Sequence, residues 1–304
     1  MGIQWRWVFS SRNRAAAASN RVPFLRAALR ALFTLLFPDD CRVCGRPLNE
    51  VSRIPVCRKC LEEPAPLNAE FFCSSCRMPF ENGFPLDAEG RCALCRSGLR
   101  GFDAAYAYGS YEGVLRELIH IYKYGKVRTL ARPLGDLLWT ALARDEAWDM
   151  IAAVPLHWRR RWQRGFNQSE LLARDLARRC GVPFVSLLKR VQPTTAQAGL
   201  SNQKRRRNVA SAFACRRMVL RRDRLAGKRV LLIDDVLTTG STAAACAAAL
   251  KKAGAGRVGI LTLARVDRRW DVRVAAQKSQ DGEMALVGKT GGEAAGTDEW
   301  GVRF

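Results

Sequence analysis

One stretch of the sequence constrains the fold more than any other. Residues 230–233 are four aliphatic side chains in a row, a pattern typical of a strand that is buried on both faces. Asp234 and Asp235 follow, then a turn rich in hydroxyl residues, and then the alanine-rich segment 243–253, which favours a helix. The sequence therefore predicts a strand, a turn and a helix in direct succession.

The predicted turn has the chemistry of a phosphate site. A helix that begins directly after a turn presents free backbone N–H groups and the positive end of its dipole to an anion. Two carboxylates at the end of the strand would accept hydrogen bonds from sugar hydroxyls beside that phosphate. A solvated loop followed by an ordinary helix cap is the alternative interpretation. The candidate phosphate-binding residues are Thr238, Thr239, Gly240, Ser241 and Thr242.

The whole stretch resembles the 5-phosphoribosyl-1-pyrophosphate (PRPP) motif of type I phosphoribosyltransferases, in which two acids end a hydrophobic strand ahead of Thr-Thr-Gly-Ser-Thr. The resemblance implies an α/β fold with a parallel sheet flanked by helices. It implies that Asp234 and Asp235 are the catalytic acids, facing the ribose hydroxyls directly or through Mg²⁺. Residues 238–242 would hold the 5-phosphate.

Eight of the eleven cysteines form four Cys-x-x-Cys pairs. Each pair offers two thiolates to one ion, so eight thiolates predict two closed, structural zinc sites. We expect sequential ribbons, because that pairing closes shorter loops; an interleaved arrangement would instead join the first pair to the third. The predicted ligands are Cys41, Cys44, Cys57 and Cys60 for one ion, and Cys73, Cys76, Cys92 and Cys95 for the other.

Cysteine usage also bears on the compartment. Paired cysteines at metal-binding spacing, without a secretory signal, indicate a reducing environment, so we expect a cytoplasmic protein. No apolar run reaches the roughly 18 residues that a membrane span requires. The short, proline-rich segments between the pairs are too polar to build a core alone, so metal should supply much of their folding energy.

The chain is strongly basic, with a formal net charge of +23. Between residues 156 and 229 there are 20 Lys or Arg against three acids. This charge exceeds what one pyrophosphate requires, and a surface for single-stranded DNA would use it. A basic protein with a solvated surface is the plainer alternative.

A second strand, 150–155, precedes a basic segment that we expect to be a loop. A helix from Glu170 to Arg179 should follow, capped by Ser169 or Asn167. The basic loop and the helix start would present cations and amides to a pyrophosphate. The candidate pyrophosphate-binding residues are Arg159, Arg164, Lys189 and Arg190.

Three further blocks narrow the resemblance: Arg164-Gly165-Phe166-Asn167-Gln168, the segment from Arg190 to Leu200, and the segment from Arg205 to Phe213. They are similar to the corresponding blocks of the ComF family, whose members join zinc ribbons to a type I phosphoribosyltransferase domain. Some members of that family function in DNA uptake during natural transformation. Gln192 departs from that pattern, where an arginine is expected. The resemblance also implies that residues 189–213 form a flexible loop that closes over the site.

These features predict four regions. A basic, partly disordered arm with a short amphipathic helix covers 1–36, and whether 1–20 belong to the true start is open. The double zinc ribbon covers 37–100, the phosphoribosyltransferase-like domain 101–268, and a disordered tail 269–304. Other elements expected in the domain are a strand over 102–111 with a turn at Gly109, helices over 114–122 and 130–144, and a strand over 258–263.

Two functions remain open at this point. The protein is either a PRPP-binding module that acts in DNA uptake through single-stranded DNA or a translocation partner protein, or an active Mg²⁺-dependent phosphoribosyltransferase that releases pyrophosphate. The charge and the ribbons favour the first, and the intact Asp-Asp-Thr-Thr-Gly motif favours the second. A purely structural adaptor is a third reading.

Overall fold

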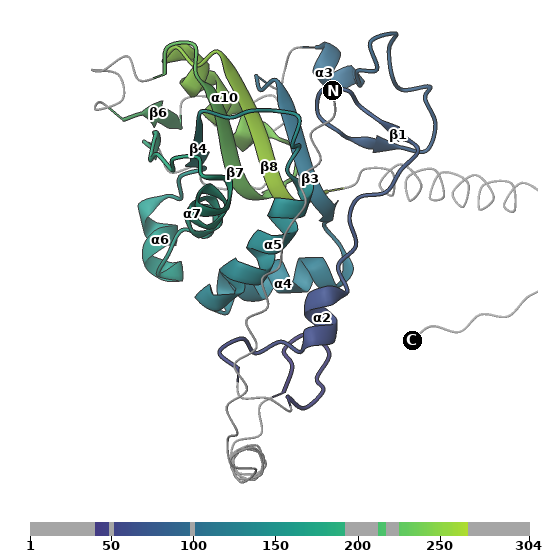
Figure 1. The fold of residues 1–304 in the computed structure, drawn as a ribbon, viewed down its shortest axis with the longest axis vertical. Helices are drawn as coiled ribbons and strands as arrows, with labels where there is room; N and C mark the ends of the chain where they lie inside the picture. The colour runs from purple at the N-terminus through teal and green to yellow at the C-terminus, as the bar shows by residue number, and fades with distance from the viewer. Residues whose placement is uncertain (1–39, 49–51, 98–100, 192–211, 217–224, 267–304) are drawn as a thin grey trace, which may run out of the picture. The chain divides into compact units, whose positions relative to one another are not determined.

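A computed structural model describes residues 40–48, 52–97, 101–191, 212–216 and 225–266 (Figure 1). The chain divides into two compact units, residues 1–57 and 58–304, and each is described by itself. The predicted arm and tail lie outside the described residues, as does most of the predicted flexible loop. The three predicted domain boundaries also fall in such segments, so they stay predictions.

The second unit contains all the described helices and strands. In chain order they are α2 (Arg58–Glu62), β1 (Phe71–Phe72), β2 (Pro79–Phe80), α3 (Ala93–Arg96), β3 (Ala104–Ser110), α4 (Gly113–Tyr124), a 3₁₀ turn (Arg128–Leu130), α5 (Ala131–Ala141), β4 (Met150–Ala153), α6 (Trp158–Arg164), α7 (Gln168–Cys180), β5 (Leu188–Arg190), β6 (Phe213–Cys215), β7 (Arg229–Leu237), α10 (Ser241–Lys252) and β8 (Arg257–Arg265).

Four of these strands form one parallel sheet in the order β3-β8-β7-β4. β7 and β8 are central, and residues 230–233 of β7 are buried on both faces, as their unbroken apolar run predicts. Parallel strands bring their carboxyl ends to one edge of the sheet, where β7 delivers Asp234 and Asp235. The expected α/β sheet and the strand–turn–helix order are confirmed.

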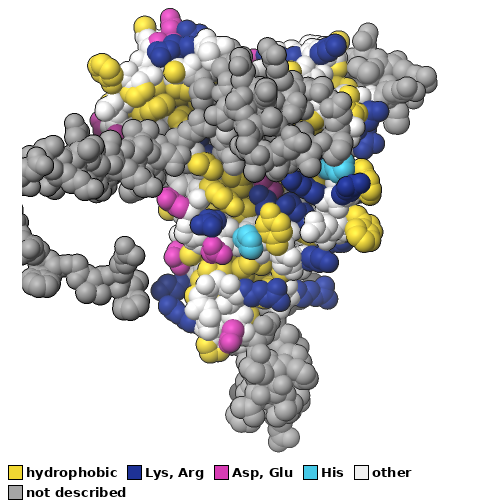
Figure 2. Space-filling view, turned by 180° about the vertical axis from the view of Figure 1, so that it is seen from behind, with side chains coloured by type: hydrophobic (Ala, Val, Ile, Leu, Met, Phe, Trp, Pro, Cys, Tyr) yellow, Lys and Arg dark blue, Asp and Glu magenta, His cyan; other side chains and the backbone are white. Residues whose placement is uncertain are grey.

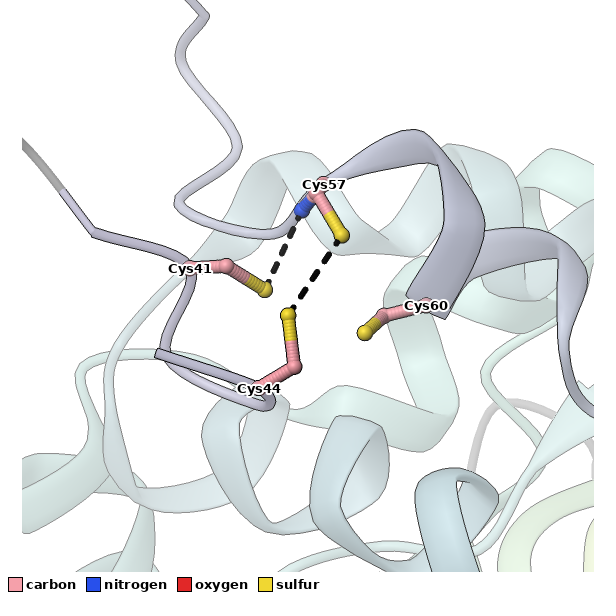
Figure 3. Close-up of side chains that lie close together, drawn as sticks. All are labelled: Cys41, Cys44, Cys57 and Cys60. Atoms are coloured by element: carbon pink, nitrogen blue, oxygen red, sulfur yellow. Dashed lines mark hydrogen bonds between the residues drawn. The ribbon is translucent and has the colours of Figure 1, made fainter. Parts of the chain in front are cut away.

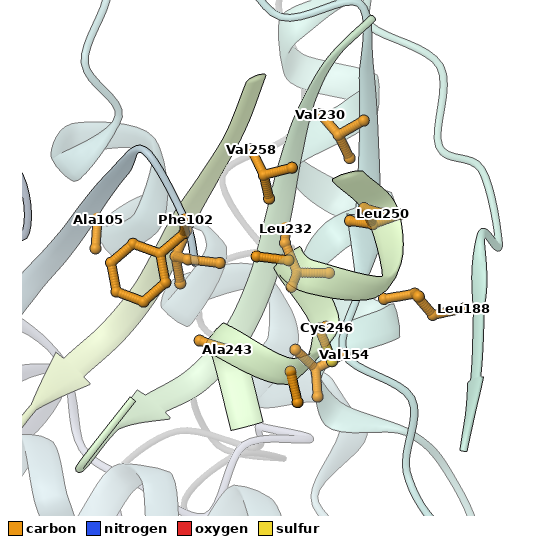
Figure 4. Packing of buried hydrophobic residues seen from close by; sticks show 14 of the residues in the cluster. Phe102, Ala105, Val154, Leu188, Val230, Leu232, Ala243, Cys246, Leu250 and Val258 are labelled. Atoms are coloured by element: carbon orange, nitrogen blue, oxygen red, sulfur yellow. The ribbon is translucent and has the colours of Figure 1, made fainter. Parts of the chain in front are cut away.

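Helices cover both faces of the sheet. Alternate residues of β7, Val230 and Leu232, join Val258 of β8 in an apolar cluster with Ala243 and Leu250 of α10 (Figure 4). Side chains along a strand alternate between faces, so Leu231 and Ile233 point to the opposite face, where α7 contacts β7 and α5 contacts β8. The sheet is thus the middle layer, and its carboxyl edge is left for the site.

The second cysteine group belongs to the same apolar core. Cys73, Cys76 and Cys92 are almost fully buried and lie in the cluster that contains the α10 face of the sheet. The buried Arg265, at the end of β8, donates from Nη1 to the carbonyl oxygen of Cys76 at 2.6 Å. Ala105 of β3 likewise donates its N–H to the carbonyl of Ser75 at 3.1 Å. The metal-binding segment and the sheet are therefore parts of one packed unit.

Two expectations were wrong. Gly109 is not a turn, because β3 continues through it to Ser110. A Cβ at Gly109 would come within 2.7 Å of Leu115 Cδ2 and 2.8 Å of the Ala65 carbonyl oxygen, so glycine allows a close approach there. The basic segment after β4 is not a loop but the helix α6, which ends at Gly165 in the left-handed conformation.

In the described part of the first unit, backbone hydrogen bonds close the loops around Cys41. Cys41 donates its N–H to the carbonyl of Arg46, and Arg42 donates to the carbonyl of Pro55. An isolated antiparallel bridge joins Asp40 to Pro47. Across the described parts of both units, no helix has the length and apolar content needed to cross a bilayer.

Candidate functional site

The turn after β7 has the geometry of an anion site. Thr238 and Thr239 are exposed, and Gly240 adopts a φ of 78°, the left-handed conformation that glycine tolerates best. α10 then begins at Ser241, whose N–H and hydroxyl both meet Thr239 Oγ1, at 3.4 and 2.9 Å. The N-terminus of α10 therefore lies at the loop that the sequence predicts for a 5-phosphate, where the N–H groups that follow Ser241 in the first turn can meet an anion.

Asp234 is held by two donors at the carboxyl end of β7. Ser169, in the first turn of α7, donates its hydroxyl to Asp234 Oδ1 at 2.9 Å, and the Asp235 N–H donates to the same oxygen at 2.9 Å. Burial and the neighbouring charge of Asp235 raise the pKa of Asp234 to about 7, although both hydrogen bonds act in the opposite direction. Asp234 is therefore poised to hold or release a proton near neutral pH.

Asp235 forms an ion pair that the sequence did not suggest. Lys123, at the end of α4, places Nζ 2.8 Å from Asp235 Oδ1, and only 14% of either side chain is exposed. The sequence gave no sign of this carboxylate partner for Lys123. A cation already faces one oxygen of Asp235, so a metal ion at that oxygen would have to compete with the ammonium group.

The start of α7 links these groups. Gln168 accepts from the Tyr122 hydroxyl at its carbonyl (3.0 Å), and its side chain accepts from Arg164 Nη1 (3.2 Å) and donates to the Lys123 carbonyl (3.5 Å). Asn167 stands at the N-cap position, but its amide donates to the Val154 carbonyl rather than capping the helix. The expected cap is wrong: Ser169 and Asn167 bind other elements and fix α7 against β4 and β7.

The predicted pyrophosphate-binding residues do not form one group. Lys189 and Arg190, on β5, line a cavity of about 190 Å³ together with Arg161 and Arg216. Arg159 and Arg164 are not among the described residues that line it. Arg159 lies over the Trp158 ring at 5.2 Å. Arg164 instead lies over the Tyr124 ring at 4.8 Å and also donates to its hydroxyl at 3.2 Å.

His157 is a further polar group at this edge. It is buried, and its Nδ1 accepts the Arg159 N–H at 3.4 Å. Burial and the charges of Arg190, Arg159 and Arg160 lower its pKa. His157 is therefore neutral at pH 7, and its ring starts α6 as an N-cap. The strand-end position of this histidine is visible in the sequence, but its burial is not.

The raised pKa of Asp234 predicts a pH effect on stability. Between its ordinary value of 3.8 and the folded value of about 7, the folded protein keeps a proton that the unfolded chain has released. The free energy of unfolding should therefore fall as pH rises through this window, by up to about 4 kcal/mol. Asp234→Asn should remove this loss, and melting temperatures of both proteins at pH 5 and pH 8 measure it. If the melting temperatures of the variant and the wild type changed equally between pH 5 and pH 8, the raised pKa would not belong to Asp234.

The two groups of four cysteines have the sequential pairing. Within each group, all four sulfur atoms lie within 4.8 Å of one another. Figure 3 shows the four side chains of the first group pointing toward a common centre. The interleaved pairing is therefore excluded. Each group offers the four thiolates that a structural zinc ion binds, with no position left for a catalytic water.

The sulfur spacing fits a tetrahedral ion. With metal–sulfur bonds of about 2.3 Å, neighbouring sulfur atoms are about 3.8 Å apart. The Sγ atoms of Cys44 and Cys57 are 3.8 Å apart, and so are those of Cys76 and Cys92. Burial raises the pKa of the Cys41 thiol. Hydrogen bonds from the N–H groups of Cys57, Cys44 and Val43 and from the Cys44 thiol outweigh burial and lower this pKa to about 6. A thiolate, the form that binds metal, is therefore favoured there.

Comparison with known proteins identifies the family of the domain and several relatives of the chain. A family model of the phosphoribosyl transferase domain matches residues 167–282. Competence protein F of Haemophilus influenzae is 35% identical over 165 residues, which cover 52% of this chain and 70% of that protein. DNA utilization protein YhgH of Escherichia coli (strain K12) is 35% identical over 162 residues, covering 51% of this chain and 69% of that protein.

Among solved structures, adenine phosphoribosyltransferase from Leishmania tarentolae overlaps 48% of this chain and 74% of its own chain. The sequence identity is 17% and the TM-score is 0.31. The fold assignment rests on the family model and on the parallel sheet, not on this overlap. Together with the two cysteine groups, those findings support a phosphoribosyltransferase fold preceded by a zinc-ribbon module.

Proposed function

The chain belongs to the ComF family, and we propose that it binds PRPP or a related phosphoribosyl ligand and acts in DNA uptake by binding single-stranded DNA or a translocation partner. The observation that carries the first part is the edge formed by β7 and α10. There Asp234 and Asp235 lie in the last part of β7, and a short turn through the left-handed Gly240 leads to the N-terminus of α10. Amides hold the phosphate in this proposal, and the carboxylates accept hydrogen bonds from the ribose hydroxyls.

The DNA part is supported by charge and by the relatives. Two of them carry the names competence protein F and DNA utilization protein. This chain adds a net charge of +23, well suited to a phosphate backbone. Its paired cysteines favour a reducing compartment, so we place the protein in the cytoplasm with a zinc ion in each cysteine group. A protein of the DNA-translocation machinery is the other partner that this role suggests.

The pyrophosphate of the ligand would meet the basic residues after β4. Lys189 and Arg190 are gathered at one cavity, and Arg159 and Arg164 lie on α6. Mg²⁺, when bound, would neutralise charge on the pyrophosphate. Carboxylate oxygens suit that ion, but Lys123 already pairs with Asp235, so we assign the ion to the ligand's pyrophosphate rather than to this side chain.

The second candidate function is an active transferase, favoured by the presence of both carboxylates at the end of β7. A nitrogen nucleophile would attack the anomeric carbon of PRPP as its bond to the pyrophosphate oxygen breaks, with the electron pair leaving on pyrophosphate. The chain would contribute positioning and charge stabilisation. No residue among those described identifies the nucleophile.

One experiment separates the two functions. Purified protein is mixed with PRPP, Mg²⁺ and a set of nucleobases, and pyrophosphate release is measured beside equilibrium binding of PRPP. Saturable PRPP binding without pyrophosphate release supports the binding function. Release that Asp235→Asn abolishes establishes the transferase instead. Absence of both PRPP binding and release would contradict the two functions together.

A further inference from the structure

The surface of α6 is unusual for a helix of a folded domain. Residues 158–163 are six consecutive exposed residues, and none of the seven side chains of α6 is buried. Trp158 is 67% exposed and Trp162 is 87% exposed. A large exposed aromatic side chain is the informative exception on a protein surface, and this short helix has two.

The two tryptophans lie on one side of the helix, with positive charge around them. A spacing of four residues places side chains next to each other on a helix surface. The other residues of α6 are four arginines and one glutamine, with no acid. In Figure 2, dark blue and yellow side chains stand side by side along the flank of the molecule that carries α6. Aromatic rings among arginines suit a strand of stacked bases with a phosphate backbone.

The cavity beside α6 points to the same class of partner. Trp158 and Arg161 of α6 line it, together with Glu170, Phe184 and Asn167. Asn167 is 9% exposed, and its Oδ1 has no hydrogen-bond partner, because its Nδ2 is the atom that meets the Val154 carbonyl. A buried acceptor without a donor is costly, and the edge of an unpaired base supplies N–H groups.

The size and chemistry of this cavity exclude larger or purely apolar occupants. At about 190 Å³ it is smaller than the 300–1,000 Å³ of typical small-molecule pockets, so it admits a fragment such as a base edge. Lipid tails would leave Asn167 Oδ1 without a donor. A seven-residue helix with arginines on most sides also lacks the continuous apolar face of an interfacial membrane helix.

We propose that α6 is a stacking surface for single-stranded nucleic acid. Trp158 and Trp162 each stack on a base, Arg160 and Arg161 contact phosphates, and the adjoining cavity takes the edge of one base at Asn167 Oδ1. This proposal rests on the proposed function only for the class of partner, which is single-stranded DNA. It assigns the DNA contact to α6, outside the β7–α10 phosphate site. Lys189 and Arg190 line the adjoining cavity as well, so a base edge there would take the place of the pyrophosphate.

The test uses full-length, metal-loaded protein and a fluorescently labelled oligothymidine of roughly 20 nucleotides, longer than the usual site sizes. Anisotropy titrations compare the wild type, Trp162→Ala and Phe84→Ala. Phe84 is the matched control, because it is an aromatic side chain that is 97% exposed outside α6. Trp162→Ala should weaken binding about 5- to 150-fold, the loss of one base stack, and Phe84→Ala should leave it within about twofold.

A strand of the same length without bases isolates the stacking. On this abasic strand Trp162→Ala should have no effect, because the phosphates are retained and the stack is absent. Arg160→Ala should instead weaken both strands alike and reduce the salt dependence by about one phosphate contact. Equal losses for Trp162→Ala on both strands, or a loss no larger than that of Phe84→Ala, would overturn the stacking surface.

Two other outcomes would overturn different parts of the proposal. Failure of the wild type to bind any oligonucleotide would overturn the DNA part of the proposed function itself, along with this surface. Binding of the wild type to vesicles with anionic headgroups that Trp162→Ala abolishes, while oligonucleotide binding is unchanged, would assign α6 to a membrane surface and overturn the nucleic-acid assignment.

Discussion

Cys73→Ser should unfold the whole parallel-sheet domain, and not only the ribbon that contains the cysteine. Cys73 is fully buried and shares one apolar cluster with the sheet and α10. The apparent binding energy of a structural zinc ion is about 10–16 kcal/mol, whereas a domain has only about 5–15 kcal/mol of stability. Loss of the ion would also release the Cys76 carbonyl, the acceptor of the buried Arg265 guanidinium.

Cys44→Ser is the matched control. Cys44 belongs to the first cysteine group, is exposed, and lies outside the described members of that cluster. We expect this variant to lose one metal ion per chain and to keep the main cooperative melting transition. Metal content by mass spectrometry and thermal melts by circular dichroism measure both effects. Cys73→Ser with a wild-type melting temperature, or metal content below two per chain in the wild type, would contradict the account.

Asp235→Asn should weaken PRPP binding by about 10- to 150-fold. Hydrogen bonds to a charged group contribute about 1.5–3 kcal/mol, and the amide retains shape but not charge. The substitution also leaves the largely buried Lys123 ammonium without its carboxylate, which changes the charge at the site. Calorimetric titration with PRPP measures the loss.

The control for Asp235→Asn is Asp136→Asn. Asp136, on α5, pairs with Arg179 of α7, and the Asp136 side chain is 61% exposed. Loss of this ion pair should therefore lower the stability of the protein little. A melt of each variant shows whether it remains folded. Unchanged PRPP affinity in a folded Asp235→Asn protein would remove Asp235 from the ligand site. A double variant with Lys123→Met then separates lost hydrogen bonding from the uncompensated charge.

The local parts of this fold could be predicted because their signals are local. An aliphatic run followed by two acids, a glycine and an alanine-rich segment specifies a buried strand, a turn and a helix without knowledge of any distant residue. The pairing of the cysteines followed from loop length, since each group closes between adjacent knuckles. The structure bears out both predictions.

The contacts within the site could not be predicted in this way. Ser169 reaches Asp234 across 65 residues, and Lys123 comes from α4, which β4, β5 and β6 separate from β7 in the chain. No periodicity in the sequence specifies such pairs, because the packing of α4 and α7 on the sheet creates them. The N-cap pattern was misleading for the same reason: tertiary partners took the side chains of Ser169 and Asn167.

The helix α6 was missed because helical sequences usually show one apolar face. Its residues are arginines, tryptophans and a glutamine, and the tryptophans face outward. Periodicity detects a helix through the face that it buries, and this helix buries none. An exposed functional surface is therefore what a periodicity argument is least able to find.

The most direct test of the central claim is a calorimetric titration of the wild-type protein, loaded with metal, with PRPP and with ribose 5-phosphate. We expect saturable binding of PRPP at one site per chain, and weaker binding of ribose 5-phosphate, which lacks the pyrophosphate that the basic residues would contact. No saturable binding of PRPP by protein that melts cooperatively and carries two metal ions would contradict this claim.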